Sequence, residues 1–238
     1  AVADQILEKF NVKICAFVSQ VGNIKLDTIP DFVDRNMVDE NITRCPSNEV
    51  SKKMEDLILE LKSNGNSVGG KVTCIIKNCP KGLGEPVFDK TEALLAQAMM
   101  SIPATKGFEI GSGFSCIEQK GSTHNDKWIN SDGNIKTETN NNGGIIGGIT
   151  NGENIEFSIA FKPPATISLD QETVNLRGED VTLQAKGRHD PCVVPRAIPI
   201  VEAMASIVIL DLLMAQLARR NLIESQNDKI NFVDSFDV

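Results

Sequence analysis

The chain has 238 residues, of which 41% are hydrophobic and 24% are charged, and its formal net charge is −8 at pH 7. This composition is that of an ordinary globular protein, long enough for one large domain or two small ones. Because an acidic chain lacks the basic surface that nucleic acids bind, we exclude nucleic acid as a partner.

The first third of the chain predicts two helices and two strands. Residues 1–10 read as the end of an amphipathic helix and show no signal-peptide pattern. Residues 11–24 are rich in β-branched side chains and predict a strand. Ser47 predicts the start of a helix, since its hydroxyl can cap the first backbone N–H groups, and apolar residues recur at helical spacing up to Leu61. Residues 71–79 predict the second strand.

The middle of the chain is rich in turn residues. A glycine loop at 80–86 leads into a predicted helix that Pro103 ends. Residues 108–118 are strand-like but are interrupted by two glycines. Residues 121–142 are polar and without periodicity, which predicts a long surface loop, and the paired glycines of 143–148 predict a turn.

Alternating apolar residues predict strands at 155–161 and, more weakly, at 181–186. A charged cluster and three prolines then precede a long apolar run. Because proline fixes φ and cannot donate a backbone hydrogen bond, we expect a stiff, extended segment up to Pro199 and a helix from there.

The apolar run at 197–218 is long enough to raise the question of a membrane span. Glu202, Asp211 and Gln216 interrupt it, and carboxylates at those depths argue against a bilayer. We therefore predict a central core helix and no membrane partner.

The order of elements predicts an α+β fold, in which antiparallel sheets cover a helical layer. We expect residues 1–225 to form a single domain and residues 226–238 to form a polar tail.

The chain contains six cysteines and two histidines, and none of the cysteines forms a C-x-x-C pair. We therefore expect no metal site. Cys15 and Cys74 lie inside apolar runs, which favours buried, reduced thiols in a cytosol-like compartment. His124 could face a site, although we expect it to lie on a surface loop, and we expect His189 to have a structural or hydrogen-bonding role.

Four positions could carry chemistry. Lys162 follows a strand and precedes two prolines, although a solvated lysine is the plain alternative. Gly147 would let the backbone approach a planar ligand, and a tight turn explains it equally well. Arg188 and Asp190 alternate in an extended segment, so both side chains could face one ligand, or they could simply form an ion pair.

Five segments, in the same order along the chain, resemble the chorismate synthase family. They are residues 45–70, 82–114, 121–126 and 141–167, and the long signature GRHDPCVVPRAIPIVEAM at 187–204. The resemblance implies a β-α-β sandwich, with a helical core between antiparallel sheets, assembled as a homotetramer.

The resemblance also implies roles for individual residues. The segment KPPAT matches the family's flavin-binding K-P-T-S-[ST] segment, with Pro164 at the usual Thr and Ala165 at the usual Ser. It implies that Arg188 contacts flavin and substrate and that Asp190 handles a proton near flavin N5, so that these two residues are the catalytic candidates. The implied flavin contacts are Pro103, Ala104, Gly147, Lys162, Pro163, Pro164, Ala165, Thr166 and Arg188.

The activity implied by the resemblance is the 1,4-elimination of phosphate from 5-enolpyruvylshikimate 3-phosphate, a shikimate-pathway reaction of aromatic amino acid biosynthesis that gives chorismate. It uses reduced FMN without net redox change. We expect a cytoplasmic location, with a plastid as the alternative.

One departure from the family affects this expectation. The family's N-terminal portion, with its G-E-S-H-G motif and its R-A-S-A-R-type flavin segment, is not in the sequence. We therefore expect that this chain alone does not turn over substrate. The alternative function is a catalytically inactive flavin- or anion-binding fragment, or an oligomerisation scaffold; a flavin oxidoreductase with net hydride transfer is less well supported, because no nicotinamide site is recognisable.

Overall fold

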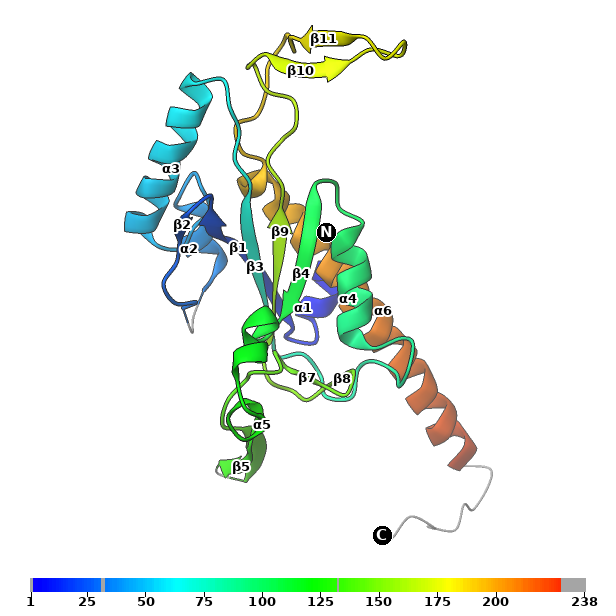
Figure 1. Cartoon of the computed structure of the whole chain (residues 1–238). Coiled ribbons are helices and arrows are strands. Elements are labelled where there is room, and N and C mark those ends of the chain that lie inside the picture. Colours follow the sequence, from blue (N-terminus) through cyan, green and yellow to red (C-terminus); the bar gives the residue numbers. More distant parts are fainter. Residues whose placement is uncertain (1, 31–32, 132, 228–238) are drawn as a thin grey trace.

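The computed structural model describes residues 2–30, 33–131 and 133–227, with side chains up to Arg219. The chain is organised around a five-stranded antiparallel sheet with strand order β2-β1-β3-β9-β4 (Figure 1). The strands are β1 (Lys13–Val21), β2 (Ile24–Lys25), β3 (Gly70–Lys77), β4 (Thr105–Ile110) and β9 (Ile155–Phe161). The predicted α+β class with antiparallel sheets is thus confirmed.

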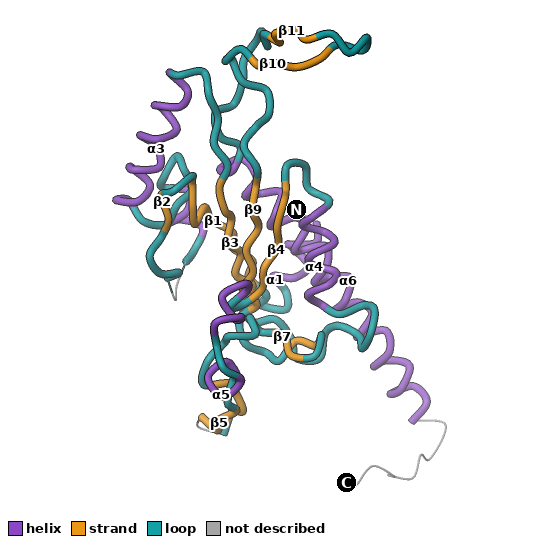
Figure 2. The backbone as a smooth tube through the Cα atoms, in the orientation of Figure 1, coloured by secondary structure: helices purple, strands orange, loops and turns teal. Residues whose placement is uncertain are grey.

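Helices cover one face of this sheet. The long helix α6 (Val194–Asn227) crosses behind it, together with α1 (Val2–Glu8) and α4 (Thr91–Met100) (Figure 2). Every second residue of β9, from Ile155 to Phe161, points into this core. Each fully buried side chain of this kind stabilises the fold by about 1.5–3 kcal/mol.

The opposite face is covered only in part. Phe17 and Ile75 pack there against Val33 and Val38, which belong to the segment around the short helix α2 (Arg35–Asp39). The helix α3 (Asn48–Ser63) lies beside β2, and the predicted Ser47 cap is confirmed, since its Oγ accepts the N–H of Val50 at 3.4 Å.

The strand-like prediction for residues 108–118 is confirmed up to Ile110 and is wrong beyond it. β4 ends at Ile110, and the residues expected to continue it form a 3-10 helix, η1 (Gly113–Glu118). Gly111 and Gly113 both have positive φ, at 54° and 52°, which ends the extended backbone.

The expected loop at 121–142 contains secondary structure. It holds a short helix, α5 (Gly121–His124), and a hairpin of β5 (Trp128–Ser131) and β6 (Asn134–Thr137). Two more hairpins follow, β7 (Ile145–Ile146) with β8 (Ile149–Thr150), and β10 (Gln171–Val174) with β11 (Asp180–Leu183).

The start of α6 also differs from the prediction. The helix begins at Val194, so the backbone is already helical at Pro195, and Pro199 lies inside the helix. Pro195 lies in the first turn, where it is tolerated because its missing N–H would have no helical partner. The helix includes residues 226 and 227 of the expected tail, and the rest of that tail lies outside the described residues.

Residues Val194–Arg219 of α6 are long and apolar enough to cross a membrane, by length and composition only. One side of the helix is buried against the sheet, as in the core helix of a globular protein. Its other side carries an exposed apolar stripe of Ile200, Ile207 and Met214, which are 48%, 56% and 52% exposed.

Candidate functional site

Three of the segments predicted to bind flavin meet at the end of the sheet where β9 stops. The backbone N–H of Lys162 donates to the carbonyl oxygen of Ala104 at 2.9 Å. Next to it, Ser67 Oγ donates to the carbonyl oxygen of Pro164 at 2.7 Å. The N–H of Val68 donates to the carbonyl oxygen of Pro191 at 2.8 Å. The residue that follows Asp190 is therefore tied to the same end of the sheet as Lys162.

The cations at this end are available to a ligand. The side chains of Lys162 and Arg188 are exposed, and within the described residues neither forms an ion pair. Thr166 is also exposed and is the one hydroxyl left in KPPAT. Guanidinium and ammonium groups in such positions can bind phosphate or carboxylate.

Asp190 has a partner that the sequence reading missed. Its carboxylate forms an ion pair with Arg196 in the first turn of α6, and Arg188, Asp190 and Arg196 line one cavity of about 340 Å³. Among the described residues Arg188 and Asp190 form no ion pair with each other, so that alternative is wrong. From the sequence we expect an extended segment up to Pro199, in which Arg196 would not lie next to Asp190; the helix that begins at Val194 brings the two together. His189 has the expected structural contact, with its Nε2 3.4 Å from the carbonyl oxygen of Ala185.

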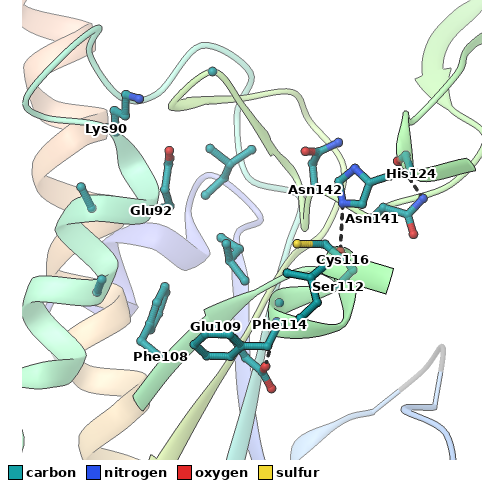
Figure 3. A pocket seen from close by; sticks show the side chains of 17 residues that line it. Lys90, Glu92, Phe108, Glu109, Ser112, Phe114, Cys116, His124, Asn141 and Asn142 are labelled. Carbon is teal, nitrogen blue, oxygen red and sulfur yellow. Dashed lines mark hydrogen bonds between the residues drawn. The ribbon is translucent and has the colours of Figure 1, made fainter. Parts of the chain in front are cut away.

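Gly147 lies elsewhere in the chain. It occupies the turn between β7 and β8 with φ +63°, and a Cβ built on it would meet nothing within 4 Å. It lines a cavity of about 790 Å³ near the opposite end of β9, because this cavity also includes Ile110, which pairs with Phe157 (Figure 3). A single chain therefore does not bring Gly147 into the cavity that contains Arg188.

This second cavity combines an apolar wall with a polar rim. Phe108, Ile110 and Ile145 contribute to the wall. His124, expected on the surface, is half-buried at the rim, where its Nε2 lies 3.0 Å from Ser112 Oγ. Glu92 Oε2 is buried from solvent and has no hydrogen-bond partner among the described residues.

Asp126 holds the polar rim of this cavity together through hydrogen bonds. Its carboxylate accepts hydrogen bonds from Thr139 Oγ1 and the backbone N–H of Asn141, both at 2.7 Å, and from the N–H and Nδ2 of Asn142, at 2.9 and 2.8 Å. Burial acts to raise the pKa of Asp126, but these hydrogen bonds outweigh it and hold the pKa below its ordinary value.

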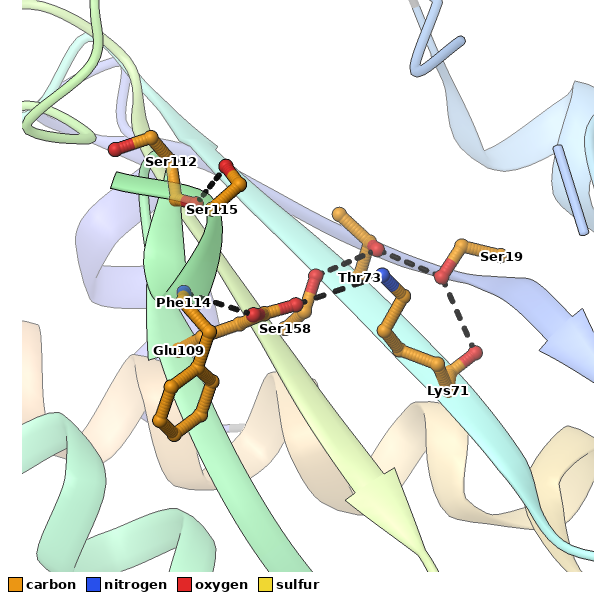
Figure 4. Close-up of polar contacts among 8 residues, drawn as sticks. All are labelled: Ser19, Lys71, Thr73, Glu109, Ser112, Phe114, Ser115 and Ser158. Atoms are coloured by element: carbon orange, nitrogen blue, oxygen red, sulfur yellow. Dashed lines mark hydrogen bonds and ion pairs between the residues drawn. The ribbon is translucent and has the colours of Figure 1, made fainter. Parts of the chain in front are cut away.

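A row of hydroxyls continues from this cavity across the sheet (Figure 4). Glu109, which lines the cavity, pairs with Lys71 at 3.4 Å. Thr73 donates to Ser19 at 2.8 Å and therefore has no hydrogen left for Ser158, so Ser158 is the donor across the 2.9 Å between them. The row satisfies the hydroxyls of three neighbouring strands, and we assign it a structural role.

A third cavity, of about 590 Å³, contains Glu202 of α6. Glu202 Oε1 accepts the backbone N–H of Ala16 at 2.7 Å and forms an ion pair with Arg35. Burial raises the pKa of Glu202, although the N–H of Ala16 and the Arg35 guanidinium act against it. Burial, followed by the charge of Glu202, raises the pKa of the nearby Cys15 thiol to about 11, which makes it a poor nucleophile.

Comparison with known proteins gives one consistent result. Residues 1–214 match the family model described as "Chorismate synthase". A chorismate synthase from Cytophaga hutchinsonii is 55% identical over 221 residues, which are 92% of this chain and 61% of the relative, and one from Prochlorococcus marinus is 52% identical over 228 residues, 94% of this chain and 62% of the relative.

The crystal structure of a chorismate synthase superposes on this chain with a TM-score of 0.76 at 30% identity, covering 99% of this chain and 68% of that one. The chain thus spans about three fifths of the length of the curated relatives it matches.

Proposed function

Since the chain belongs to the chorismate synthase family, we propose that it serves the 1,4-elimination of phosphate from 5-enolpyruvylshikimate 3-phosphate, which gives chorismate in the shikimate pathway, with reduced FMN as cofactor. The observation that carries the proposal is the gathering of Ala104, Lys162 and Pro191 at one end of the sheet, in a chain that matches the family over residues 1–214. We also propose a cytoplasmic location.

The residues present fit an anionic, planar cofactor. Lys162 and Arg188 offer exposed positive charge, and Gly147 leaves open space above its backbone. Pro164 and Ala165 cannot donate hydrogen bonds from their side chains, so Thr166 is the hydroxyl donor of this segment. Reduced FMN, when bound, supplies electron density to the substrate ring as phosphate leaves.

The chain's own contribution is to bind anions and to hold a proton acceptor. Arg188 can grip a carboxylate or phosphate with two parallel hydrogen bonds, and positive charge beside a departing phosphate stabilises the transition state. Asp190 is the group for proton handling, and the ion pair with Arg196 fixes where its carboxylate lies. Arg196 is thus a positioning residue for Asp190.

A homotetramer accounts for the separation of Gly147 from Lys162. The two residues flank opposite ends of β9, which has seven residues and is therefore about 20 Å long. A flavin that contacts both in the same site needs Gly147 from a neighbouring copy.

The implied sandwich also needs a second sheet. Among the described residues one large sheet covers α6, and the outer side of the helix carries the stripe of Ile200, Ile207 and Met214. An exposed apolar stripe along a core helix is the surface that a second sheet would bury.

The test is an anaerobic titration with reduced FMN, followed by an assay for chorismate. Binding together with elimination supports the proposal and overturns the expectation that this chain alone does not turn over substrate. Binding without turnover supports the alternative, a flavin-binding scaffold. No binding would overturn both. Lys162→Ala and Arg188→Ala should weaken FMN binding, whereas Lys53→Ala, at an exposed lysine of α3 that pairs with Glu49, should leave it unchanged.

A further inference from the structure

The loop between α3 and β3, residues 64–69, contacts both segments that carry the candidate cations. Ser67 Oγ donates to the carbonyl oxygen of Pro164 at 2.7 Å, in the segment of Lys162. The backbone N–H of the next residue, Val68, donates to the carbonyl oxygen of Pro191 at 2.8 Å, in the segment of Arg188. Because consecutive Cα atoms are about 3.8 Å apart, this loop ties the two segments together at a short spacing.

The chain that connects the two segments provides no rigid link between them. It leaves the sheet as the projecting hairpin of β10 and β11, and residues 172–174 and 176–184 of this excursion are all exposed (Figure 1). A two-stranded hairpin with both faces in water is marginally stable at best. The spacing between Lys162 and Arg188 therefore depends on the loop that holds both segments.

Two further backbone contacts join the loop to the segment of Lys162. The N–H of Ser168 donates to the carbonyl oxygen of Gly65 at 2.9 Å. A Cβ built on Gly69 would lie 2.3 Å from the carbonyl oxygen of Phe161 and 3.1 Å from the carbonyl carbon of Lys162. A side chain at residue 69 would therefore push the loop away from the segment, and glycine permits this close approach.

The loop is itself held by regular structure on both sides. The N–H of Asn66 donates to the carbonyl oxygen of Leu61 in α3 at 2.8 Å, and the N–H of Gly22, which follows β1, donates to the carbonyl oxygen of Gly69 at 3.0 Å. A binding residue is held precisely when the groups that support it are themselves fixed. The loop has this property.

We propose that the α3–β3 loop sets the spacing between Lys162 and Arg188, and that Ser67 is a positioning residue for the segment of Lys162. The single hydroxyl hydrogen of Ser67 is used on the carbonyl of Pro164, so Ser67 acts on a ligand through that backbone. Cations that are held in place before an anion arrives bind it at a lower entropic cost. This inference rests on the proposed function, because reduced FMN is the anion that the two segments are proposed to bind.

Substitutions at Ser67 test the inference by FMN affinity. Ser67→Ala removes the hydroxyl and should raise the dissociation constant of reduced FMN roughly two- to tenfold, whereas Ser67→Thr keeps a hydroxyl and should restore most of the affinity. Ser63→Ala is the matched control, since Ser63 Oγ donates to the carbonyl oxygen of Glu60 at 2.7 Å, at the exposed end of α3. Equal affinities in Ser67→Ala and the wild type, or an equal loss in Ser63→Ala, overturn the inference.

A double-mutant cycle with Lys162→Ala separates positioning from a general effect on the fold. If Ser67 acts through the segment of Lys162, Ser67→Ala should weaken FMN binding much less in the Lys162→Ala background than in the wild type. A purely structural loss would instead lower the affinity by the same factor in both backgrounds, and that result contradicts a positioning role.

Hydrogen exchange without flavin tests the loop independently of the proposed function. Protection of the amides of Lys162 and Ser168 should fall in Ser67→Ala and should persist in Ser67→Thr and Ser63→Ala. Unchanged protection in Ser67→Ala overturns the inference. A wild-type chain that binds no FMN overturns the proposed function instead, and the exchange result then decides by itself whether Ser67 holds the segment in place.

Discussion

The backbone N–H of Lys162 lies 2.9 Å from the carbonyl oxygen of Ala104 and donates a hydrogen bond to it. This bond continues the pairing of β9 with β4 past the partners Phe161 and Thr105. Ala104 has a φ of 71°, a left-handed backbone conformation that residues other than glycine rarely adopt. The bond thus ties the backbone of Lys162, from which its side chain projects, to a left-handed residue at the start of β4.

This strain predicts opposite effects for two substitutions at Ala104. Ala104→Val should lower the free energy of unfolding by about 1–3 kcal/mol, because a β-branched side chain tolerates positive φ poorly. Ala104→Gly should leave the stability unchanged or raise it by up to about 1 kcal/mol. Urea denaturation of the three proteins measures both effects, and equal losses in the two variants would contradict a left-handed Ala104.

Asp126 should make the stability of the 121–142 region decrease at low pH. Its pKa is lower in the folded chain than in the unfolded chain, so its contribution is present above the unfolded value, about 4, and is lost as the pH falls through the folded value. Asp126→Asn should remove about 1–3 kcal/mol at neutral pH and flatten the acid dependence.

The measurement for Asp126 is hydrogen exchange at the amides of Asn141 and Asn142, which donate to its carboxylate. Protection there should fall below pH 4 in the wild type and should already be low in Asp126→Asn at pH 7. Unchanged protection in the variant would mean that Asp126 does not hold the region together.

The contribution of Glu202 to stability should depend on pH in the opposite direction to that of Asp126. Because burial raises the pKa of Glu202 in the folded chain, ionisation costs more in the folded chain than in the unfolded one. Its contribution to stability should therefore decrease as the pH rises from the unfolded value, about 4.5, through the folded value. Glu202→Gln removes this slope and keeps an oxygen for the N–H of Ala16, so we expect only a small change at pH 7.

Glu202→Ala is the matched variant. It leaves the N–H of Ala16 and the guanidinium of Arg35 without their acceptor, which should cost about 1–3 kcal/mol. Thermal unfolding from pH 4 to 8 separates the two variants. If Gln and Ala destabilise equally, the hydrogen bond to Ala16 contributes nothing.

Local sequence patterns predicted the parts of the fold that local physics determines. β9 follows from the strict alternation between Ile155 and Phe161, and α3 follows from the Ser47 cap and its apolar spacing. The 121–142 region could not be predicted in this way, because Asp126 holds it through partners 13 to 16 residues away. Long-range hydrogen bonds of this kind leave no periodic signal.

The sequence allowed us to name candidate site residues, but it did not show which of them lie next to one another. Lys162 and Ala104 meet through a backbone bond between distant strands, which only the sheet register reveals. Placing the helix start at Pro199 hid the contact of Arg196 with Asp190. Gly147 lies near the other end of β9, and the roles of these residues in flavin binding stay predictions.

The KPPAT segment allows a test by gain of affinity. Pro164→Thr and Ala165→Ser would restore the two hydroxyls of the family's segment, and each hydroxyl that reaches the cofactor should contribute about 0.5–1.5 kcal/mol, up to roughly tenfold in the dissociation constant of reduced FMN. The carbonyl of residue 164 would still accept the bond from Ser67, so the local backbone should persist. Val174→Thr, on the projecting hairpin, is the control for an added hydroxyl. Anaerobic fluorescence titration measures the affinities, and an unchanged value in the double variant would mean that the flavin does not lie against residues 164 and 165.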